Sequence, residues 1–145
     1  MTRYEHTQVG HVVIWTLVAA AVLVALQATV KLGPHREPLL IVSVVLLIAL
    51  ALFYKLTITI DNVTLRASLG IGLIRKRVRI AGIVGCESIR IRWWYGWGIH
   101  LTPYDWLYNV SGLEAVAITL RNGRKFALGT DDPHGLVEAI QAAMP

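Results

Sequence analysis

The chain has 145 residues, of which 55% are apolar and only 16% are charged, and its mean hydropathy is +0.57. An ordinary soluble globular protein is excluded, because about a quarter of the residues in such a protein are charged. Its formal charge of +5 suits an anionic membrane surface or a nucleic acid and selects neither. The single cysteine, Cys86, excludes an internal disulfide and a cysteine-rich metal site. We therefore expect membrane segments and one small domain.

Two apolar runs dominate the first third of the chain. Residues 12–32 hold one charge, Lys31, close to their end. A helix of this length covers roughly 30 Å, which is enough to cross the hydrocarbon core of a bilayer. A second uncharged run at residues 39–53 extends through Tyr54 to Leu56 and is also long enough to span. Both runs are predicted to be transmembrane helices.

Residues 33–38, between the runs, contain Gly33, Pro34 and Pro38 and predict a tight turn. A cleaved signal peptide is disfavoured because a second apolar run follows the first. Buried helices of a soluble protein are disfavoured because too few residues remain to surround a hairpin. The prediction is a cytoplasmic N-terminus at residues 1–10, a transmembrane hairpin at residues 11–56 and a cytoplasmic domain at residues 57–145.

The cations that flank the helices predict the orientation of the hairpin. The turn holds Lys31 and Arg36 beside Glu37. A larger basic set flanks the opposite helix ends: Arg3, Lys55, Arg66, Arg75, Lys76, Arg77 and Arg79. Because the larger basic set stays in the cytoplasm, we expect a multi-pass protein of the cytoplasmic membrane with both termini in the cytoplasm.

From Leu56 onward the apolar pattern takes the two-residue period of a strand. Alternation predicts strands at residues 56–60, 63–67, 75–80, 83–93, 115–120 and 125–128, and Asp61-Asn62 predicts a turn between the first two. Asn122-Gly123 predicts a hairpin between the last two strands. The tryptophan-rich residues 93–112 predict the middle of the sheet, with a bend at Gly96 and Gly98 and a further strand. The expected total is about seven strands.

The C-terminal residues predict one helix. Asp132 suits the N-cap position and Pro133 the first helical position. Leu136, Val137 and Ile140 recur at helical spacing and form one apolar stripe. We expect this amphipathic helix to lie across an open end or face of the sheet, so that the fold class is α+β.

Six short segments of the sheet region form a recognisable set: residues 58–62, 73–80, 83–87, 95–99, 108–112 and 129–133. This set resembles bacterial membrane proteins with a pleckstrin-homology-like (PH-like) domain. The resemblance implies a bent antiparallel seven-stranded sheet capped by a helix, in a protein of the bacterial inner membrane. His100 departs from the pattern, where a basic Arg or Lys is expected. The motif residues expected to be structural are Tyr95, Gly96, Trp97, Gly98, Asn109, Gly112, Asp132 and Pro133.

Four aromatic residues are candidates for a binding surface: Trp94, Tyr104, Trp106 and Tyr108. Trp and Tyr are enriched both at membrane interfaces and in protein interfaces, so the partner can be lipid or protein. The alternative is that such rings fill the core. We expect core packing for Trp97, because a glycine on either side allows close backbone approach.

The second candidate surface is the basic segment Arg75, Lys76, Arg77 and Arg79. Alternation places the three arginines on one strand face and Lys76 on the other. Each cation near an anionic leaflet contributes about 1 kcal/mol to membrane attraction. The alternative is a solvated face that discourages association between sheet edges. Nucleic acid is not an expected partner of a domain held at a membrane.

No catalytic site, metal site or cofactor is expected. The five histidines are scattered without metal-ligand spacing, Asp131-Asp132 is better read as a helix start, and Ser111 does not lie in a Gly-x-Ser-x-Gly motif. We expect a non-enzymatic module that binds a membrane-protein partner or its own copies, without a small-molecule substrate. Binding of anionic membrane lipids, or of a small ligand, to the basic strand and assembly of a larger membrane complex are the alternatives.

Overall fold

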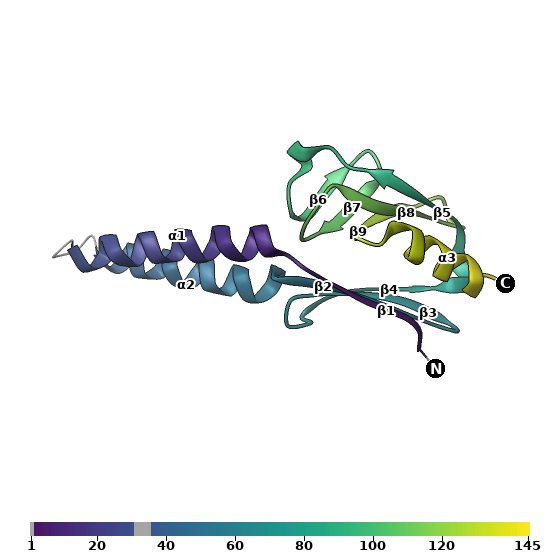
Figure 1. Ribbon diagram of the computed structural model, residues 1–145, viewed down its shortest axis with the longest axis horizontal. Coiled ribbons are helices and arrows are strands. Elements are labelled where there is room, and N and C mark those ends of the chain that lie inside the picture. The colour runs from purple at the N-terminus through teal and green to yellow at the C-terminus, as the bar shows by residue number, and fades with distance from the viewer. Residues whose placement is uncertain (1, 31–35) are drawn as a thin grey trace.

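The computed structural model describes residues 2–30 and 36–145 and has an α+β architecture, which confirms the predicted class. Two long helices project from one end, and two sheets with a third helix form a domain at the other end (Figure 1). Lys31 and residues 33–35 of the predicted turn lie outside the described residues. Residues 36–38, predicted as the end of the turn, instead form the first turn of the second helix.

Helices α1 (His11–Val30) and α2 (Arg36–Phe53) confirm the two predicted apolar helices. Each is long and apolar enough to cross a membrane. Ala21 and Ala28 of α1 are buried, because their small side chains allow α2 to approach closely. Most other apolar side chains of the pair are exposed: 11% of the α1 span and none of the α2 span is buried. The hairpin therefore presents apolar surface on almost every side.

The first sheet has the antiparallel order β1-β2-β3-β4. Its strands are β1 (Thr2–Val9), β2 (Lys55–Asp61), β3 (Thr64–Leu69) and β4 (Ile74–Arg79). Strand β2 begins two residues after α2 ends, so Lys55 and Leu56 belong to the sheet rather than to the predicted hairpin. The Asp61 side chain accepts hydrogen bonds from the Val63 and Thr64 backbone N–H groups, at 2.8 and 2.7 Å, and confirms the predicted turn there.

Strand β1 was not predicted. Residues 1–10 were expected as a separate polar start, yet β1 pairs with β2 from Tyr4 opposite Ile60 to Val9 opposite Lys55. Its inward-facing residues include Gln8 and Tyr4 rather than a row of aliphatic side chains. The alternation of apolar and polar residues that predicts a strand is therefore absent from this segment. The Gly10 N–H donates to the Tyr54 carbonyl at 2.8 Å. The helical hairpin is therefore an insertion between two paired strands of one domain.

The second sheet has the order β5-β8-β9-β7-β6. Its strands are β5 (Ile83–Arg90), β6 (Gly98–Thr102), β7 (Asp105–Asn109), β8 (Glu114–Leu120) and β9 (Lys125–Gly129). The described residues thus hold nine strands in two sheets, instead of about seven in one. The β7 and β9 strands are parallel, so the sheet is not wholly antiparallel. The β8–β9 hairpin turns at Asn122-Gly123 as predicted.

The tryptophan-rich stretch differs most from the expectation. Strand β5 ends at Arg90, and Trp93–Tyr95 form a short 3-10 helix, η2, rather than the continuation of a strand. Gly96 and Gly98 have φ angles of 67° and 103°, which confirms the predicted bend. Strand β6 then lies at the edge of its sheet, not in the middle.

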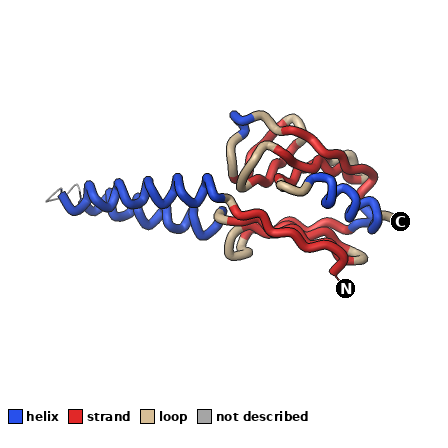
Figure 2. Tube along the Cα trace, in the orientation of Figure 1, coloured by secondary structure: helices blue, strands red, loops and turns tan. Residues whose placement is uncertain are grey.

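Helix α3 (Pro133–Ala143) confirms the predicted C-terminal helix and packs against both sheets (Figure 2). The Gly135 N–H donates to Asp132 Oδ1 at 3.0 Å, and Pro133 opens the helix. Such an N-cap stabilises a helix by about 1 kcal/mol. Leu136 and Ile140 are fully buried in a core to which both sheets contribute. A smaller apolar cluster contains Leu107 and Ala115 of the second sheet.

Candidate interaction surfaces

The junction between the helices and the domain is held by backbone hydrogen bonds. The Gly70 N–H, in the β3–β4 turn, donates to the Lys55 carbonyl at 2.8 Å, and the Ile71 N–H donates to the Ala51 carbonyl at 3.1 Å. Gly70 adopts a φ of 54° and is buried against the Ala51 and Leu52 carbonyls. Only glycine enters this position without strain. The turn therefore fixes the first sheet to the last turn of α2.

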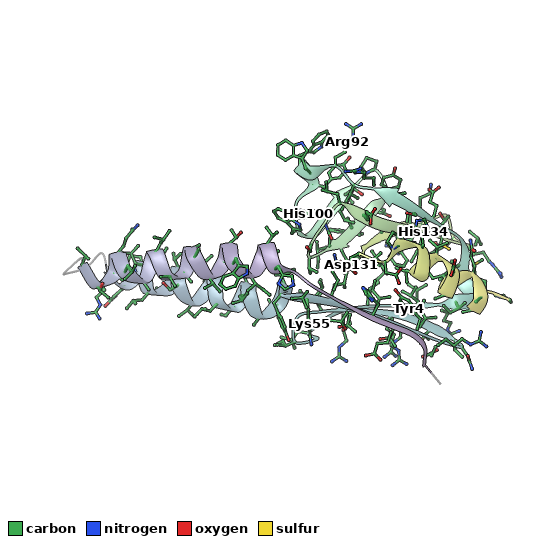
Figure 3. All side chains as sticks on the ribbon, in the orientation of Figure 1. Tyr4, Lys55, Arg92, His100, Asp131 and His134 are labelled. Carbon is green, nitrogen blue, oxygen red and sulfur yellow. The ribbon has the colours of Figure 1, made fainter. Side chains whose placement is uncertain are left out.

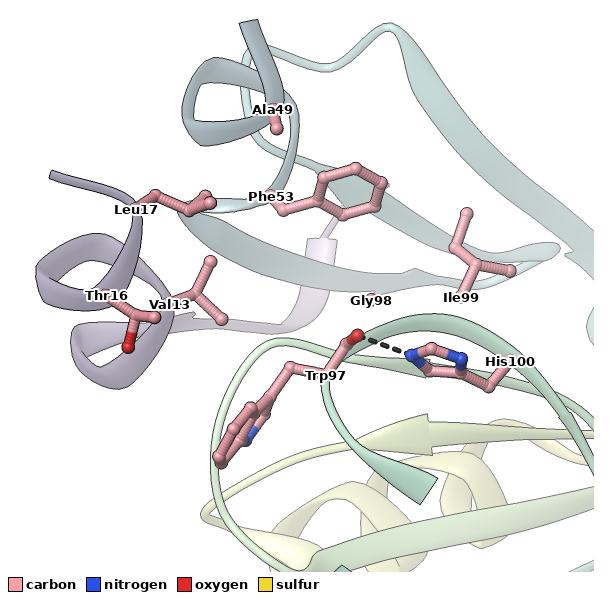
Figure 4. Close-up of a pocket in the computed structure, with 9 residues that line it drawn as sticks. All are labelled: Val13, Thr16, Leu17, Ala49, Phe53, Trp97, Gly98, Ile99 and His100. Atoms are coloured by element: carbon pink, nitrogen blue, oxygen red, sulfur yellow. Dashed lines mark hydrogen bonds between the residues drawn. The ribbon is translucent and has the colours of Figure 1, made fainter. Parts of the chain in front are cut away.

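A cleft lies on the other side of the junction, between the helix pair and strand β6 (Figure 4). Its volume is about 410 Å³, and its walls are mostly apolar. The lining residues are Val13, Thr16, Leu17, Ala49, Phe53, Trp97, Gly98, Ile99 and His100. The His100 imidazole Nε2 is hydrogen-bonded to the Trp97 carbonyl. Trp97 is 44% exposed, so the prediction that it packs in the core was wrong.

Two loop segments that carry exposed apolar side chains lie at the end of the domain that faces the helices (Figures 1 and 2). One is the β3–β4 turn, where Ile71 and Leu73 are 61% and 74% exposed. The other is η2, where Trp93 and Trp94 are 74% and 55% exposed and meet edge to face. We call these four side chains the helix-side rim. They flank the junction at the level where the helices leave the domain.

Cations accompany the aromatic side chains at this end. The Arg92 guanidinium lies 4.9 Å from the centre of the Trp94 ring, and Lys55 Nζ lies 5.3 Å from the centre of the Tyr54 ring. Arg92 and Lys55 come from opposite sides of the domain (Figure 3). Each pair combines an apolar ring with a charged tip, which is the combination favoured where apolar and aqueous phases meet.

The basic segment divides as alternation predicts. Arg75, Arg77 and Arg79 are exposed on the outer face of the first sheet. Lys76 is half-buried on the other face, with Nζ 5.3 Å from the centre of the Phe126 ring in the core. The lysine side chain thus faces the core, opposite to the side chains of the arginines with which we grouped it.

A shallow hollow of about 320 Å³ lies on this outer face. Arg75, Lys76 and Arg77 of β4 line it together with residues of β2 and β3: Thr57, Thr59, Arg66, Ala67 and Ser68. The Arg66 guanidinium lies 3.6 Å from the Asp61 carboxylate. Hydrogen bonds from Val63 and Thr64 lower the pKa of Asp61 to about 2. The hollow offers hydroxyl and guanidinium donors, a set that suits phosphate oxygens.

Strand β6 is an unprotected edge. Of the four edge strands in the described part of the chain, β1 and β5 contact α3, and β4 carries three arginines. Strand β6 reads Gly-Ile-His-Leu-Thr and has none of the Lys, Arg or Pro residues that discourage edge pairing. Leu101 and Trp106 lie opposite each other in the β6–β7 hairpin and are 68% and 43% exposed.

The other predicted aromatic candidates serve the fold. Tyr104 and Tyr95 are half-buried against the smaller apolar cluster, and Tyr108 is half-buried against the main core. Burial and the nearby Asp105 carboxylate raise the pKa of Tyr108. Of the four predicted candidates, Trp94 and Trp106 therefore remain available to a partner, and Trp97, which was not predicted as one, is exposed as well.

Asn109 and Gly112 have the structural roles predicted for them. Asn109 is fully buried, its Nδ2 donates to the Gly112 carbonyl at 3.2 Å, and its Oδ1 accepts from the Ser111 N–H at 3.3 Å. Gly112 has a φ of 73°. A Cβ atom on Gly129 would lie 2.1 Å from Asn109 Oδ1. Contacts of Asn109 with the backbone therefore hold the β7–β8 connection together, and they leave no room for a larger residue at Gly129.

One polar cluster joins β1 to the start of α3. Tyr4 Oη donates to Asp132 Oδ2 at 3.2 Å, and the His6 imidazole contacts the Asp131 carboxylate. Burial, with the two carboxylates, raises the pKa of Tyr4. Within residues 2–30 and 36–145, no three His, Cys, Asp or Glu side chains are grouped so as to hold a metal ion. No family model, curated protein or solved structure matches the chain.

Proposed function

We propose that this chain is a non-enzymatic, membrane-anchored module of a bacterial inner membrane. Helices α1 and α2 cross the bilayer and hold a PH-like domain at its cytoplasmic face. There the domain binds a membrane-protein partner or a second copy of itself. The exposed apolar faces of both helices support the anchoring, and the arginines of β4 support the cytoplasmic placement.

The free edge of β6 is the observation that carries the proposed association. An edge strand presents unpaired N–H and C=O groups that a strand from another chain can complete. The β6 strand lacks charged residues and proline, unlike the arginine-bearing β4 edge. The exposed Leu101–Trp106 pair adds apolar area beside this edge. Tryptophan is among the residues that most often dominate binding energy in protein interfaces.

A second copy of the chain is one partner that this edge can accept. Two β6 strands that pair antiparallel about a two-fold axis join the two second sheets into one continuous sheet. The Leu101 side chains of the two copies then lie close together at the new interface.

Disulfide crosslinking of the full chain tests this proposal. Leu101→Cys in a Cys86→Ser background is expected to form covalent dimers on mild oxidation in detergent micelles. Val84→Cys is the matched control, because Val84 is an exposed apolar residue on the β5 edge of the same sheet. Equal crosslinking of the two variants would contradict pairing through β6. A strictly monomeric full chain without a co-purifying protein would contradict the proposed association altogether.

Anionic lipid recognition by the basic face is a second candidate, favoured by the hollow that Arg75 and Arg77 line. Strand β4 belongs to the sheet that continues from α2 (Figure 1), so its arginines are stacked along the direction of the helices. At about 3.3 Å per strand residue, Arg79 lies about 13 Å farther from the helices than Arg75. The screening length is about 10 Å in 0.1 M salt. Arg75 therefore interacts with the leaflet most strongly.

The two candidates respond to different substitutions. Arg75→Ala with Arg77→Ala is expected to reduce the phosphatidylglycerol that the full chain retains in mixed micelles, measured against phosphatidylcholine. Arg121→Ala with Arg124→Ala removes the same charge from the exposed β8–β9 turn and serves as the control. Equal loss of lipid in both variants would leave only net charge as the cause and would rule out recognition by this face.

A further inference from the structure

We propose that the cleft between the helix pair and β6 is a phospholipid site that takes one acyl chain from the surrounding leaflet. This inference rests on the proposed membrane anchoring and goes beyond it, because it assigns an occupant to a defined site. The volume of about 410 Å³ lies within the range of roughly 300–1,000 Å³ that is common for ligand sites.

The chemistry of the walls selects a hydrocarbon occupant. Val13, Leu17 and Phe53 present aliphatic and aromatic carbon, and Trp97 closes the opposite side. The Nε2 atom of His100 is already hydrogen-bonded to the Trp97 carbonyl within the wall. Water enters a cavity stably only where it finds two to four polar partners. The cleft therefore disfavours water and suits a chain of methylene groups.

The position of the cleft selects lipid rather than a soluble apolar molecule. Val13 and Leu17 lie about 3 and 9 Å along α1 from its first residue, at 1.5 Å per residue. The helical wall of the cleft is thus continuous with the apolar faces that the proposed anchoring places in hydrocarbon. A lipid chain is the apolar molecule already present at that depth, and its entry requires no passage through water.

The helix-side rim supports the same placement. Ile71 and Leu73 project from the turn that is hydrogen-bonded to α2, so their level relative to the bilayer is set by that helix. Trp93 and Trp94 form the exposed tip on the other side. Tryptophan is enriched at the interface between hydrocarbon and water. Contact of both tips with one leaflet would remove this apolar surface from water.

Cations also lie at the helix-facing end of the domain, outside the set of residues that line the cleft. Lys55 and Arg92 lie at the helix-facing end on opposite sides of the domain, each over an aromatic ring (Figure 3). Their charged groups extend from the apolar rim toward water, as lysine and arginine do at membrane surfaces. The helix-facing end of the domain thus carries an apolar cleft, exposed aromatic side chains and cations, which are the kinds of group that phospholipids contact at a membrane interface.

Tryptophan quenching in vesicles tests the site in the full chain. Three variants each keep a single tryptophan, at Trp15, Trp97 or Trp106, with Phe at the others. The vesicles contain phosphatidylcholine and phosphatidylglycerol with acyl chains brominated near the carboxyl end. We expect strong quenching of Trp97 and little quenching of Trp106. Quenching of Trp97 no stronger than that of Trp106 would overturn the proposal.

Trp15 separates failure of the site from failure of the anchoring. It is 69% exposed on α1, so its quenching reports whether the helix lies in the bilayer. Quenching of Trp15 without quenching of Trp97 would sink the lipid site and leave the anchoring intact. Absence of quenching at both positions would overturn both. The proposed protein association is measured separately, by the Leu101→Cys crosslink.

Filling the cleft provides a second measurement. The native mass of the full chain, released from mild detergent, is expected to include one retained phospholipid. Ala49→Phe places a ring among the lining residues and is expected to abolish this retention. Ala19→Phe adds the same ring to an exposed position of α1 that does not line the cleft and should retain the lipid. Equal retention by Ala49→Phe and the unsubstituted chain would contradict occupancy of the cleft.

Discussion

The attachment of the β3–β4 turn to α2 can be tested by adding a single methyl group. Gly70 has a φ of 54°, and a Cβ atom there would lie 2.2 Å from the Ala51 carbonyl oxygen and 2.4 Å from that of Leu52. Both obstacles are backbone atoms and cannot rotate away as a side chain does. Gly70→Ala is therefore expected to push the turn off the helix.

The expected loss of stability follows from two contributions. A non-glycine residue in the left-handed region costs about 1–2 kcal/mol. Displacement of the turn also breaks the Gly70–Lys55 and Ile71–Ala51 hydrogen bonds, each with a net value of about 0.5–1.5 kcal/mol. Gly70→Ala should thus lower the free energy of unfolding by about 2–5 kcal/mol, as the sum of these terms.

Gly123→Ala is the matched control. Gly123, in the β8–β9 turn, has a φ of 82°, and a Cβ atom there meets nothing within 4 Å. This variant should lose only the backbone contribution of about 1–2 kcal/mol. The assay is urea unfolding of the full chain in micelles, followed by tryptophan fluorescence. The losses expected for the two variants differ by roughly 1–3 kcal/mol, so the urea midpoint of Gly70→Ala should fall by about 1 M more than that of Gly123→Ala. Equal midpoints for the two variants would refute the attachment of the turn to α2.

Three further predictions address the architecture. Replacement of residues 11–53 by Asn-Gly preserves the β1–β2 hairpin and should therefore give a soluble folded domain, as measured by gel filtration and circular dichroism. A chain that begins at Lys55 lacks β1 and should aggregate. Equal solubility of the two chains would show that β1 is dispensable. The pKa of Asp61 is about 2 in the folded chain, below the usual aspartate pKa of about 3.9. The ionised Asp61 side chain therefore contributes its full stabilisation at a pH above about 3.9, and this contribution is lost as the pH falls toward 2. Asp61→Asn keeps an acceptor oxygen without titrating, so its urea midpoint should fall less over that pH range, and parallel pH profiles would contradict this role. In a Cys86→Ser background, an impermeant maleimide added outside cells should label cysteine at Glu37 and not at Arg77; the reverse pattern would invert the proposed orientation.

Features set by neighbouring residues were predictable from the sequence. The apolar runs of α1 and α2 needed no tertiary information, because their length and composition alone produce the pattern. The turn after Asp61, the Asn122-Gly123 turn and the Asp132-Pro133 helix start likewise depend on hydrogen bonds and φ angles within a few residues. The alternation of β4 correctly separated its arginines from Lys76.

The candidate surfaces were only partly predictable. Trp94 and Trp106 are exposed as the binding hypothesis requires, whereas Tyr104 and Tyr108 pack against apolar clusters. Glycines beside Trp97 indicated a close backbone approach, yet a lone tryptophan between them gave no sign of whether its ring faces a core or a helix pair. Val13 and Phe53 line the same cleft as Trp97, although these residues lie far apart in the chain.

Local pattern thus determined that this protein has two apolar helices, a strand-rich domain and a capped C-terminal helix, because periodicity, turn chemistry and capping act over a few residues. Only the tertiary structure decided that β1 completes the first sheet across the inserted helices, that β7 and β9 run parallel, and that β6 is a free edge. Strand order depends on which distant backbones meet, and the same alternation suits a central strand and an edge. The cleft beside Trp97 and the rim around the helix junction depend on that long-range pairing.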